Sequence, residues 1–229
     1  MSFWSRLSDT IASVGSSLSA YLAGLAQSRV QAPERSIVFT IGMIALGAKM
    51  AKADGVVTQD EIEAFKRIYV IEQHDFESVA RVFNLAKQDV AGYGSYARQI
   101  AKLFKGKPKL LEDVLDGLFH IAKADGAVHE RELAFLMDIA SIFGFSDAEF
   151  DRIRARHVAL PQANPHVILG VEPSISDADL KKAWRKLVRD NHPDKHIAAG
   201  MPAEAVKIAT ARLASINAAY DALAKVRGL

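Results

Sequence analysis

The sequence predicts an all-α protein of two domains, and three observations lead to this fold class. Apolar residues recur at spacings of three and four along much of the chain, as they do on one face of an α-helix. No run of alternating β-branched residues marks a strand. The length of 229 residues suits two small domains, and a proline-containing stretch interrupts the helical pattern near Gln162. We expect an amphipathic segment over residues 1–30, a helical domain over 31–158 and a shorter domain, with a linker at its start, over 159–229.

The composition excludes several classes of function. Basic and acidic residues number 29 and 27, so the chain as a whole has no strong field that attracts nucleic acid. The absence of cysteine excludes disulfides, thiolate metal sites and thiol nucleophiles, and it fits a reducing compartment. The longest strongly apolar stretch, from Ile37 to Ala48, has 12 residues, too few to span a bilayer. We expect a cytoplasmic protein in which this stretch forms a buried helix.

The first 30 residues contain an apolar stripe of helical periodicity. Its members are Trp4, Leu7, Ile11, Val14, Leu18, Tyr21 and Leu25. The opposite face consists mainly of Ser, Ala and Gly, with few basic residues to bind anionic lipid. Several interpretations stay open: peripheral contact with the inner face of the plasma membrane, self-association, and a helix that packs on its own domain or is loosely ordered.

A repeat lies inside the helical pattern between about Ser36 and Arg156. The segment AKADGVVTQDEI, which begins at Ala51, returns 71 residues later as AKADGAVHEREL, which begins at Ala122. Such repetition indicates two matched helix-turn-helix units. In each unit the glycine can close one helix, and the aspartate before it can accept backbone hydrogen bonds in the turn.

The acidic residues of the repeat have two interpretations. The glutamate seven residues after the aspartate falls in the first turn of the next helix, so capping and turn chemistry explain the pattern. A carboxylate at each end of a Gly-containing turn also resembles a shortened calcium loop, although the intermediate oxygen ligands are missing. This second interpretation places a divalent metal at Asp54, Glu61, Asp125 and Glu132.

The two ADG-x-V-x-x-x-E units in an all-α block of this size resemble the TerB-like domain. That family is associated with tellurite-resistance proteins and with one class of membrane-linked chaperone partners. The resemblance covers about half of the chain and implies a helical domain.

Helical periodicity returns after the prolines of residues 155–167. Ser176 and Asp177 are suited to cap a helix whose apolar positions then recur at i, i+3, i+4, i+7 and i+8. Those positions are Leu180, Ala183, Trp184, Leu187 and Val188. Five basic residues occupy the complementary face: Lys181, Lys182, Arg185, Lys186 and Arg189. A charged face is usually a solvated face, but five like charges repel one another, so an acidic partner is the second interpretation.

The stretch RDNHPDKH, from Arg189 to His196, ends this helix. Pro193 lacks a backbone donor and pushes the residue before it out of the α region, so we expect a tight polar turn that contains Asp194. A second amphipathic helix from about Pro202 is expected to pack antiparallel to the first. The turn would then stand at one end of a helical hairpin, as a metal site, an acid/base pair or a rigid loop displayed to a partner.

The residues themselves disfavour several of these roles. A metal site would use His192, Asp194 and His196, but the proline limits their convergence and no fourth ligand is evident. A catalytic pair needs burial and a nucleophile, which an exposed turn does not offer. Nucleic-acid binding is disfavoured because Trp184 lies on the apolar face. The sequence has no GxxxxGK[ST] phosphate loop, and we expect no nucleotide site and no enzymatic activity in this chain.

The last 65 or so residues resemble the J-domain of DnaJ-type co-chaperones. NPHVILGVEPSISDADLKKAWRKLVRDNHPDKH, followed by INAAYDAL, has the ILGV segment, the basic helix, the HPDK loop and the INAAY helix in the order and at the spacings of that family. The resemblance implies docking on a DnaK-type (heat-shock protein 70) chaperone and stimulation of its ATP hydrolysis. The signature loop falls on His192, Pro193 and Asp194, the electrostatic contact falls on the five basic residues above, and the ATP site would belong to the partner.

A TerB-like domain followed by a C-terminal J-domain resembles the DjlA class of co-chaperones. Members of that class are typically held at the inner membrane by a transmembrane segment, whereas the first 30 residues here are amphipathic, so we expect peripheral attachment or a soluble form. The Gly/Phe-rich segment and CxxCxGxG repeats of full-length DnaJ are missing, so we expect the TerB-like domain to choose a location or client. The alternative function is a TerB-like metal-binding or stress-response module with a secondary J-like tail.

Overall fold

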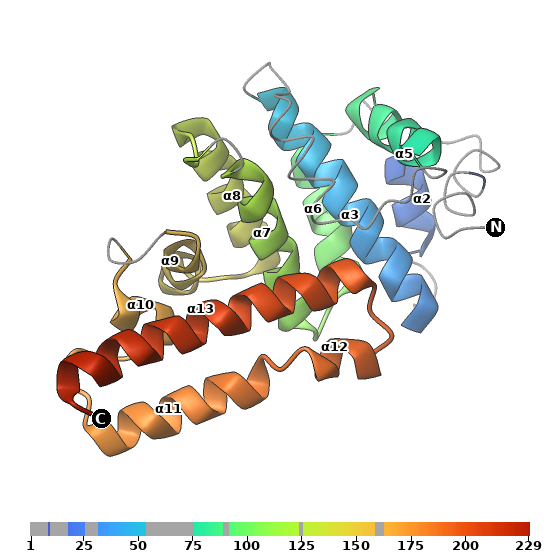
Figure 1. The fold of residues 1–229 in the computed structure, drawn as a ribbon. Helices are drawn as coiled ribbons and strands as arrows, with labels where there is room; N and C mark the ends of the chain where they lie inside the picture. The colour runs from blue at the N-terminus through green and yellow to red at the C-terminus, as the bar shows by residue number, and fades with distance from the viewer. Residues whose placement is uncertain are drawn as a thin grey trace.

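The computed structural model describes residues 9, 18–25, 32–53, 76–88, 92–123, 126–158 and 163–229. Within these ranges all regular secondary structure is helical and no strand occurs, which confirms the predicted all-α class (Figure 1). We call α2 to α9 the N-terminal domain, with α2 (Leu18–Leu25), α3 (Ala32–Ala53), α5 (Phe76–Gln88), α6 (Tyr93–Leu103), α7 (Pro108–Ala122), α8 (Glu130–Phe143) and α9 (Asp147–Arg156). We call the remainder the C-terminal domain, with α10 (Pro165–Leu169), α11 (Asp177–Asp190), α12 (Asp194–Ala198) and α13 (Ala203–Arg227).

Helix α3 forms the centre of the N-terminal domain. Its apolar stretch from Ile37 to Ala48 is the predicted buried helix, and every side chain from residue 38 to residue 50 is buried. Helices α5, α6, α7 and α8 pack around it. None of the described helices is both long enough and apolar enough to cross a membrane.

Only part of the predicted N-terminal stripe lies among the described residues. In α2 the side chain of Leu18, a member of the stripe, is fully buried, as is that of Leu22, which the stripe did not include, and the helix packs against α6. For residues 18–25 this arrangement matches the interpretation of a helix packed on its own domain. Trp4, Leu7 and the rest of the stripe before residue 18 lie outside the described residues.

The C-terminal domain is built on the predicted hairpin, in which α11 and α13 run antiparallel (Figure 1). The hydroxyl of Ser176 accepts a hydrogen bond from the backbone N–H of Asp179 at 3.1 Å, so Ser176 is the N-cap of α11. Helix α10 closes one end of the hairpin. The small core contains Ile168, Leu169, Leu180, Ile216, Ala219 and Leu223.

Helix α13 belongs to the cores of both domains. Ile216 and Leu223, in its second half, lie in the C-terminal core. Ala205 and Ile208, in its first half, lie in the core of the N-terminal domain. The approach is close because α7 has a glycine at the crossing: a Cβ on Gly117 would lie 3.0 Å from the Ile208 side chain. The two domains are therefore packed against each other through a shared helix.

Candidate functional site

The predicted signature loop lies between α11 and α12, at the end of the hairpin. Helix α11 ends at Asp190, and its C-cap, Asn191, donates a hydrogen bond from Nδ2 to the carbonyl of Leu187 at 2.8 Å. The side chains of His192 and Asp194 are 47% and 79% exposed. The backbone N–H of Asp194 donates to Nδ1 of His192 at 3.3 Å, which holds the imidazole against the turn. The two polar side chains of the tripeptide are thus open to solvent, and a local hydrogen bond supports the turn.

The predicted turn is followed by a short helix that the sequence analysis did not predict. Pro193 adopts a helical φ of −58°, and α12 begins at the next residue, Asp194. Proline is compatible with this position because the first turn of a helix needs no backbone donor there. The helix places His192, Pro193 and Asp194 at its start, and its last turn leads into the connection to α13.

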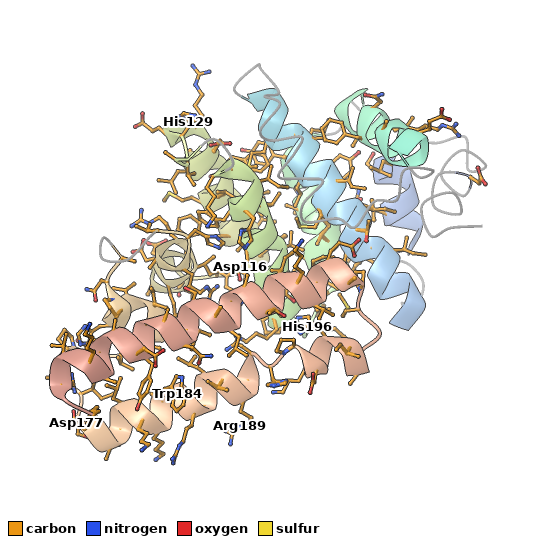
Figure 2. The ribbon with its side chains drawn as sticks, in the orientation of Figure 1. Asp116, His129, Asp177, Trp184, Arg189 and His196 are labelled. Carbon is orange, nitrogen blue, oxygen red and sulfur yellow. The ribbon has the colours of Figure 1, made fainter. Side chains whose placement is uncertain are left out.

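All five basic residues predicted for partner contact are exposed on α11, and Arg189 points away from α13 (Figure 2). One of them, Lys186, is paired with an acidic residue of the same helix. Lys186 donates to the carboxylate of Asp190 at 2.7 Å. Oδ1 of Asp190 also lies 3.8 Å from Nε of Arg189 and 3.9 Å from Nζ of Lys195. The hydrogen bond from Lys186 lowers the pKa of Asp190, so the carboxylate stays charged and offsets part of the positive field beside the loop.

Trp184 lies between α11 and α13, as Figure 2 shows. Its ring stacks on Tyr220 with the centroids 4.3 Å apart, and its Nε1 donates to Oδ1 of Asn217 at 2.9 Å. The ring packs on the small core and is not displayed with the basic residues. This position agrees with the interpretation of Trp184 as part of the core.

His196 occupies a position that the sequence analysis did not anticipate. Its side chain is 8% exposed, and Nε2 lies 2.5 Å from Oδ2 of Asp113 in α7. Asn191, on the other side of the tripeptide, accepts a hydrogen bond from Nζ of Lys109, also in α7, at 3.0 Å. Residues from the N-terminal domain therefore bind the chain immediately before and shortly after the loop.

A buried cluster of charges lies where α7, α9 and α13 meet. Its carboxylates, Glu112, Asp113 and Asp116, all come from α7. Asp113 and Asp116 both accept hydrogen bonds from Arg212 of α13, whose side chain is fully buried. From α9, Arg156 lies 2.8 Å from Glu112.

The opposite charges decide the ionisation of this cluster. Burial alone would raise the pKa of Glu112, but Arg212 and Arg156 outweigh it and lower the pKa to about 2. Burial also opposes ionisation of Asp116, and the two arginines again hold its pKa well below the usual range. Glu112 and Asp116 are therefore charged at neutral pH, and the arginines that compensate them come from both domains.

The acidic repeat is described only in part. Glu132 is in the first turn of α8, and its Oε2 accepts a hydrogen bond from the backbone N–H of His129 at 2.9 Å. Gly126, in the turn before α8, has a φ of +110°, which favours glycine. Asp54, Glu61 and Asp125 lie outside the described residues. Within the described ranges, no group of three His, Cys, Asp or Glu side chains is placed to hold a metal ion.

An exposed His-Pro-Asp loop at the end of an antiparallel hairpin, next to a basic helix, is the architecture of a J-domain. The comparisons with known proteins agree with this assignment. The DnaJ domain family matches residues 164–227, and the family described as tellurite resistance protein TerB matches residues 40–155. No solved structure matches the chain.

Several curated relatives match most of the chain, and they share one name. The chain is 28% identical to the co-chaperone protein DjlA of Photobacterium profundum, over 90% of this chain and 83% of that protein. It is 26% identical to the co-chaperone protein DjlA of Shewanella oneidensis, over 90% and 85%. It is 25% identical to the co-chaperone protein DjlA of Escherichia coli K12, over 85% and 82%. The chain belongs to the DjlA class of J-domain co-chaperones, with a TerB domain before its J-domain.

Proposed function

We propose that this chain binds a DnaK-type (heat-shock protein 70) chaperone through its J-domain and stimulates ATP hydrolysis by that chaperone. One observation carries the proposal: the His192-Pro193-Asp194 loop, in which the side chains of His192 and Asp194 are exposed, lies directly beside the exposed basic face of α11. The basic face is Lys181, Lys182, Arg185, Lys186 and Arg189. The chain itself supplies no nucleotide site in this scheme, and the ATP is bound by the partner.

The physical properties of this surface favour rapid and reversible docking. An exposed stripe of positive charge steers an acidic partner into contact and raises the association rate. A loop that is already ordered loses little conformational entropy when it binds. These properties suit a partner that is engaged once in each cycle of ATP hydrolysis and then released.

The decisive measurement is single-turnover ATP hydrolysis by a DnaK-type chaperone from the same organism. We expect the wild-type protein to accelerate hydrolysis and the His192→Gln variant to lose the acceleration, because glutamine cannot reproduce the imidazole that contacts the partner. The imidazole of His192 is 47% exposed, so the variant is expected to fold.

The matched control is His166→Gln, a histidine replacement in α10 of the same domain. This variant is expected to stimulate hydrolysis as the wild type does. Acceleration that survives in His192→Gln would contradict the proposed role of the loop. A folded wild-type protein without any acceleration would contradict the proposed function as a whole.

We also propose that the TerB domain directs this activity to a location or a client. The segment before residue 18 supplies a peripheral membrane contact or a contact between copies of the chain in this proposal. The absence of cysteine supports action in the reducing cytoplasm. The alternative function is a divalent metal site at Asp54, Glu61, Asp125 and Glu132, which we place second to a capping role such as the one Glu132 has at His129.

A further inference from the structure

The TerB domain binds the chain on both sides of the signature loop. Nζ of Lys109 donates to Oδ1 of Asn191, directly before His192, at 3.0 Å. Oδ2 of Asp113 lies 2.5 Å from Nε2 of His196, two residues after Asp194. Lys109 and Asp113 are four residues apart in α7 and therefore lie on one face of that helix. A single helical face of the TerB domain thus contacts both ends of the loop.

The contacts before the loop leave Asn191 fully engaged. Asn191 is 2% exposed. Its Nδ2 caps α11 by donating to Leu187, while its Oδ1 accepts from Lys109. A buried amide is costly unless both of its ends are paired. The end of α11 is therefore fixed relative to α7, and the direction in which the chain leaves α11 is fixed with it.

The contacts after the loop are apolar as well as polar. Met201 is buried in the core of the TerB domain, and Ala199 packs against that core. Asp113, which binds His196, also accepts a hydrogen bond from Arg212 of α13. The short segment from α12 to α13 is consequently held on the TerB domain by its own side chains and by the helix that follows.

These contacts leave the proposed partner surface open. The side chains of His192 and Asp194 are exposed, as are all five basic residues of α11. Figure 2 shows His196 turned toward the rest of the molecule and Arg189 turned away from it. The TerB domain therefore contacts the chain at Asn191 and His196 and leaves the side chains of His192 and Asp194 exposed.

We propose that Lys109 and Asp113 of the TerB domain are positioning residues that hold the His192-Pro193-Asp194 loop, through Asn191 and His196, in the conformation that binds the chaperone. This inference rests on the proposed function. A loop held in this way binds without first being ordered, whereas a released loop is competent for only part of the time. The apparent dissociation constant then rises in inverse proportion to the competent fraction.

The test separates the affinity of the chain for the chaperone from the maximal stimulation of ATP hydrolysis. Single-turnover ATP hydrolysis is measured against increasing concentrations of the full-length chain for wild type, Lys109→Met, His196→Leu and the double variant. We expect each single variant to raise the concentration for half-maximal stimulation about threefold to tenfold, and the double variant to raise it further, with the maximal stimulation retained. His192→Gln, in contrast, is expected to lose the maximal stimulation itself.

Conservative replacements provide the rescue. Lys109→Arg keeps a cationic donor for Asn191, and His196→Gln keeps an amide donor for Asp113, so both are expected to return toward the wild-type half-maximal concentration. His196→Leu leaves the carboxylate of Asp113 paired with Arg212, so the domain interface keeps its charge balance. Lys105→Met, which removes an exposed lysine just before α7, is the matched control and is expected to equal the wild type.

Hydrogen exchange reports on the loop without the chaperone. The backbone N–H groups of His196 and Ile197 donate to the carbonyl of Pro193 and are expected to exchange faster in Lys109→Met and His196→Leu. The amides in the middle of α11 are expected to keep their wild-type rates. Unchanged half-maximal concentration and unchanged exchange in both variants would overturn this inference while leaving the proposed function intact. No stimulation by the wild type would overturn the proposed function first and this inference with it.

Discussion

At the scale of single residues, a few polar side chains on otherwise apolar helix faces determine how the two domains meet. Arg212 lies on the buried side of α13, four residues before the core residue Ile216. A buried charge costs several kcal/mol in lost hydration unless a partner compensates it, and here the carboxylates of Asp113 and Asp116 do so. A buried charge is therefore stable only where the helices place its oppositely charged partners beside it. Other arrangements of the two domains are destabilised.

The hydrogen bond of Glu132 gives a prediction at this scale. Glu132→Ala is expected to lower the free energy of unfolding by about 1 kcal/mol, because the backbone N–H of His129 loses its acceptor at the start of α8. Urea denaturation measures the change. Glu130→Ala, an exposed glutamate in the same helical turn, is the control and is expected to cost less.

The same glutamate can decide whether the repeat binds metal. If capping is the whole role of Glu132, a chelator leaves the Tm of the wild type unchanged, and this is the result we expect. A Tm that falls on addition of EDTA and recovers with a divalent cation would instead establish a metal site, because a ligand that binds only the folded state raises Tm.

At the scale of elements, the stability of the α11–α13 hairpin depends on the contacts between the two helices. Trp184 provides two of these contacts, since it stacks on Tyr220 and donates to Asn217. An aromatic pair of this geometry contributes beyond the area that it buries. The loop lies at the end of the hairpin, so its position depends on the packing of α11 against α13.

Loss of the tryptophan is therefore expected to weaken the hairpin. Trp184→Ala should lower the free energy of unfolding by about 3 kcal/mol, through lost burial and the unpaired Asn217, and Trp184→Phe by about 1 kcal/mol. Urea denaturation followed by circular dichroism measures both. A Trp184→Ala variant as stable as the wild type would show that the stack does not hold the two helices together.

The elements were predictable from sequence because their causes are local. Three-and-four spacing identified α11 and α13, Ser176 marked the start of α11, and Pro193 marked its end. The contact between His196 and Asp113 had no local signal, since 83 residues separate the two. Glu112, Asp113 and Asp116 of α7 are buried, and acidic side chains are ordinarily exposed, so their position had no local signal either. One signal was available: Arg212 is a lone cation on the apolar side of α13, and such a residue needs a carboxylate partner.

At the scale of the whole molecule, stability depends on groups whose ionisation the fold changes. Burial, together with the nearby His157 and Lys123, lowers the pKa of His120 in α7 to about 4, and Asp116 only partly opposes these effects. A histidine whose folded pKa is depressed is most stabilising above its ordinary pKa. Its contribution is lost as the pH falls from about 6.5 to about 4, because the unfolded chain binds the proton more readily.

We therefore expect the free energy of unfolding to fall between pH 6.5 and pH 4, and His120→Phe to remove part of that fall, at most about 3 kcal/mol. Below about pH 4.5 a second loss is expected in both proteins as the unfolded chain protonates Glu112, whose folded pKa is about 2. Urea titrations at a series of pH values measure both stages. If the free energy of unfolding fell equally with pH in His120→Phe and in the wild type between pH 6.5 and pH 4, His120 would not be the group responsible for the fall.

The helix shared by both cores would link the two binding events of the proposed function, one on each domain. Helix α13 has Ile208 in one core and Ile216 in the other, so the TerB domain and the J-domain cannot move apart without opening one of the cores. A molecule that binds the TerB domain and stabilises this docked arrangement would thereby strengthen binding of the chaperone. Linkage is reciprocal, so the chaperone would strengthen the binding of that molecule by the same factor. Under the proposed function, the choice of client and the recruitment of the ATPase would then be one coupled equilibrium.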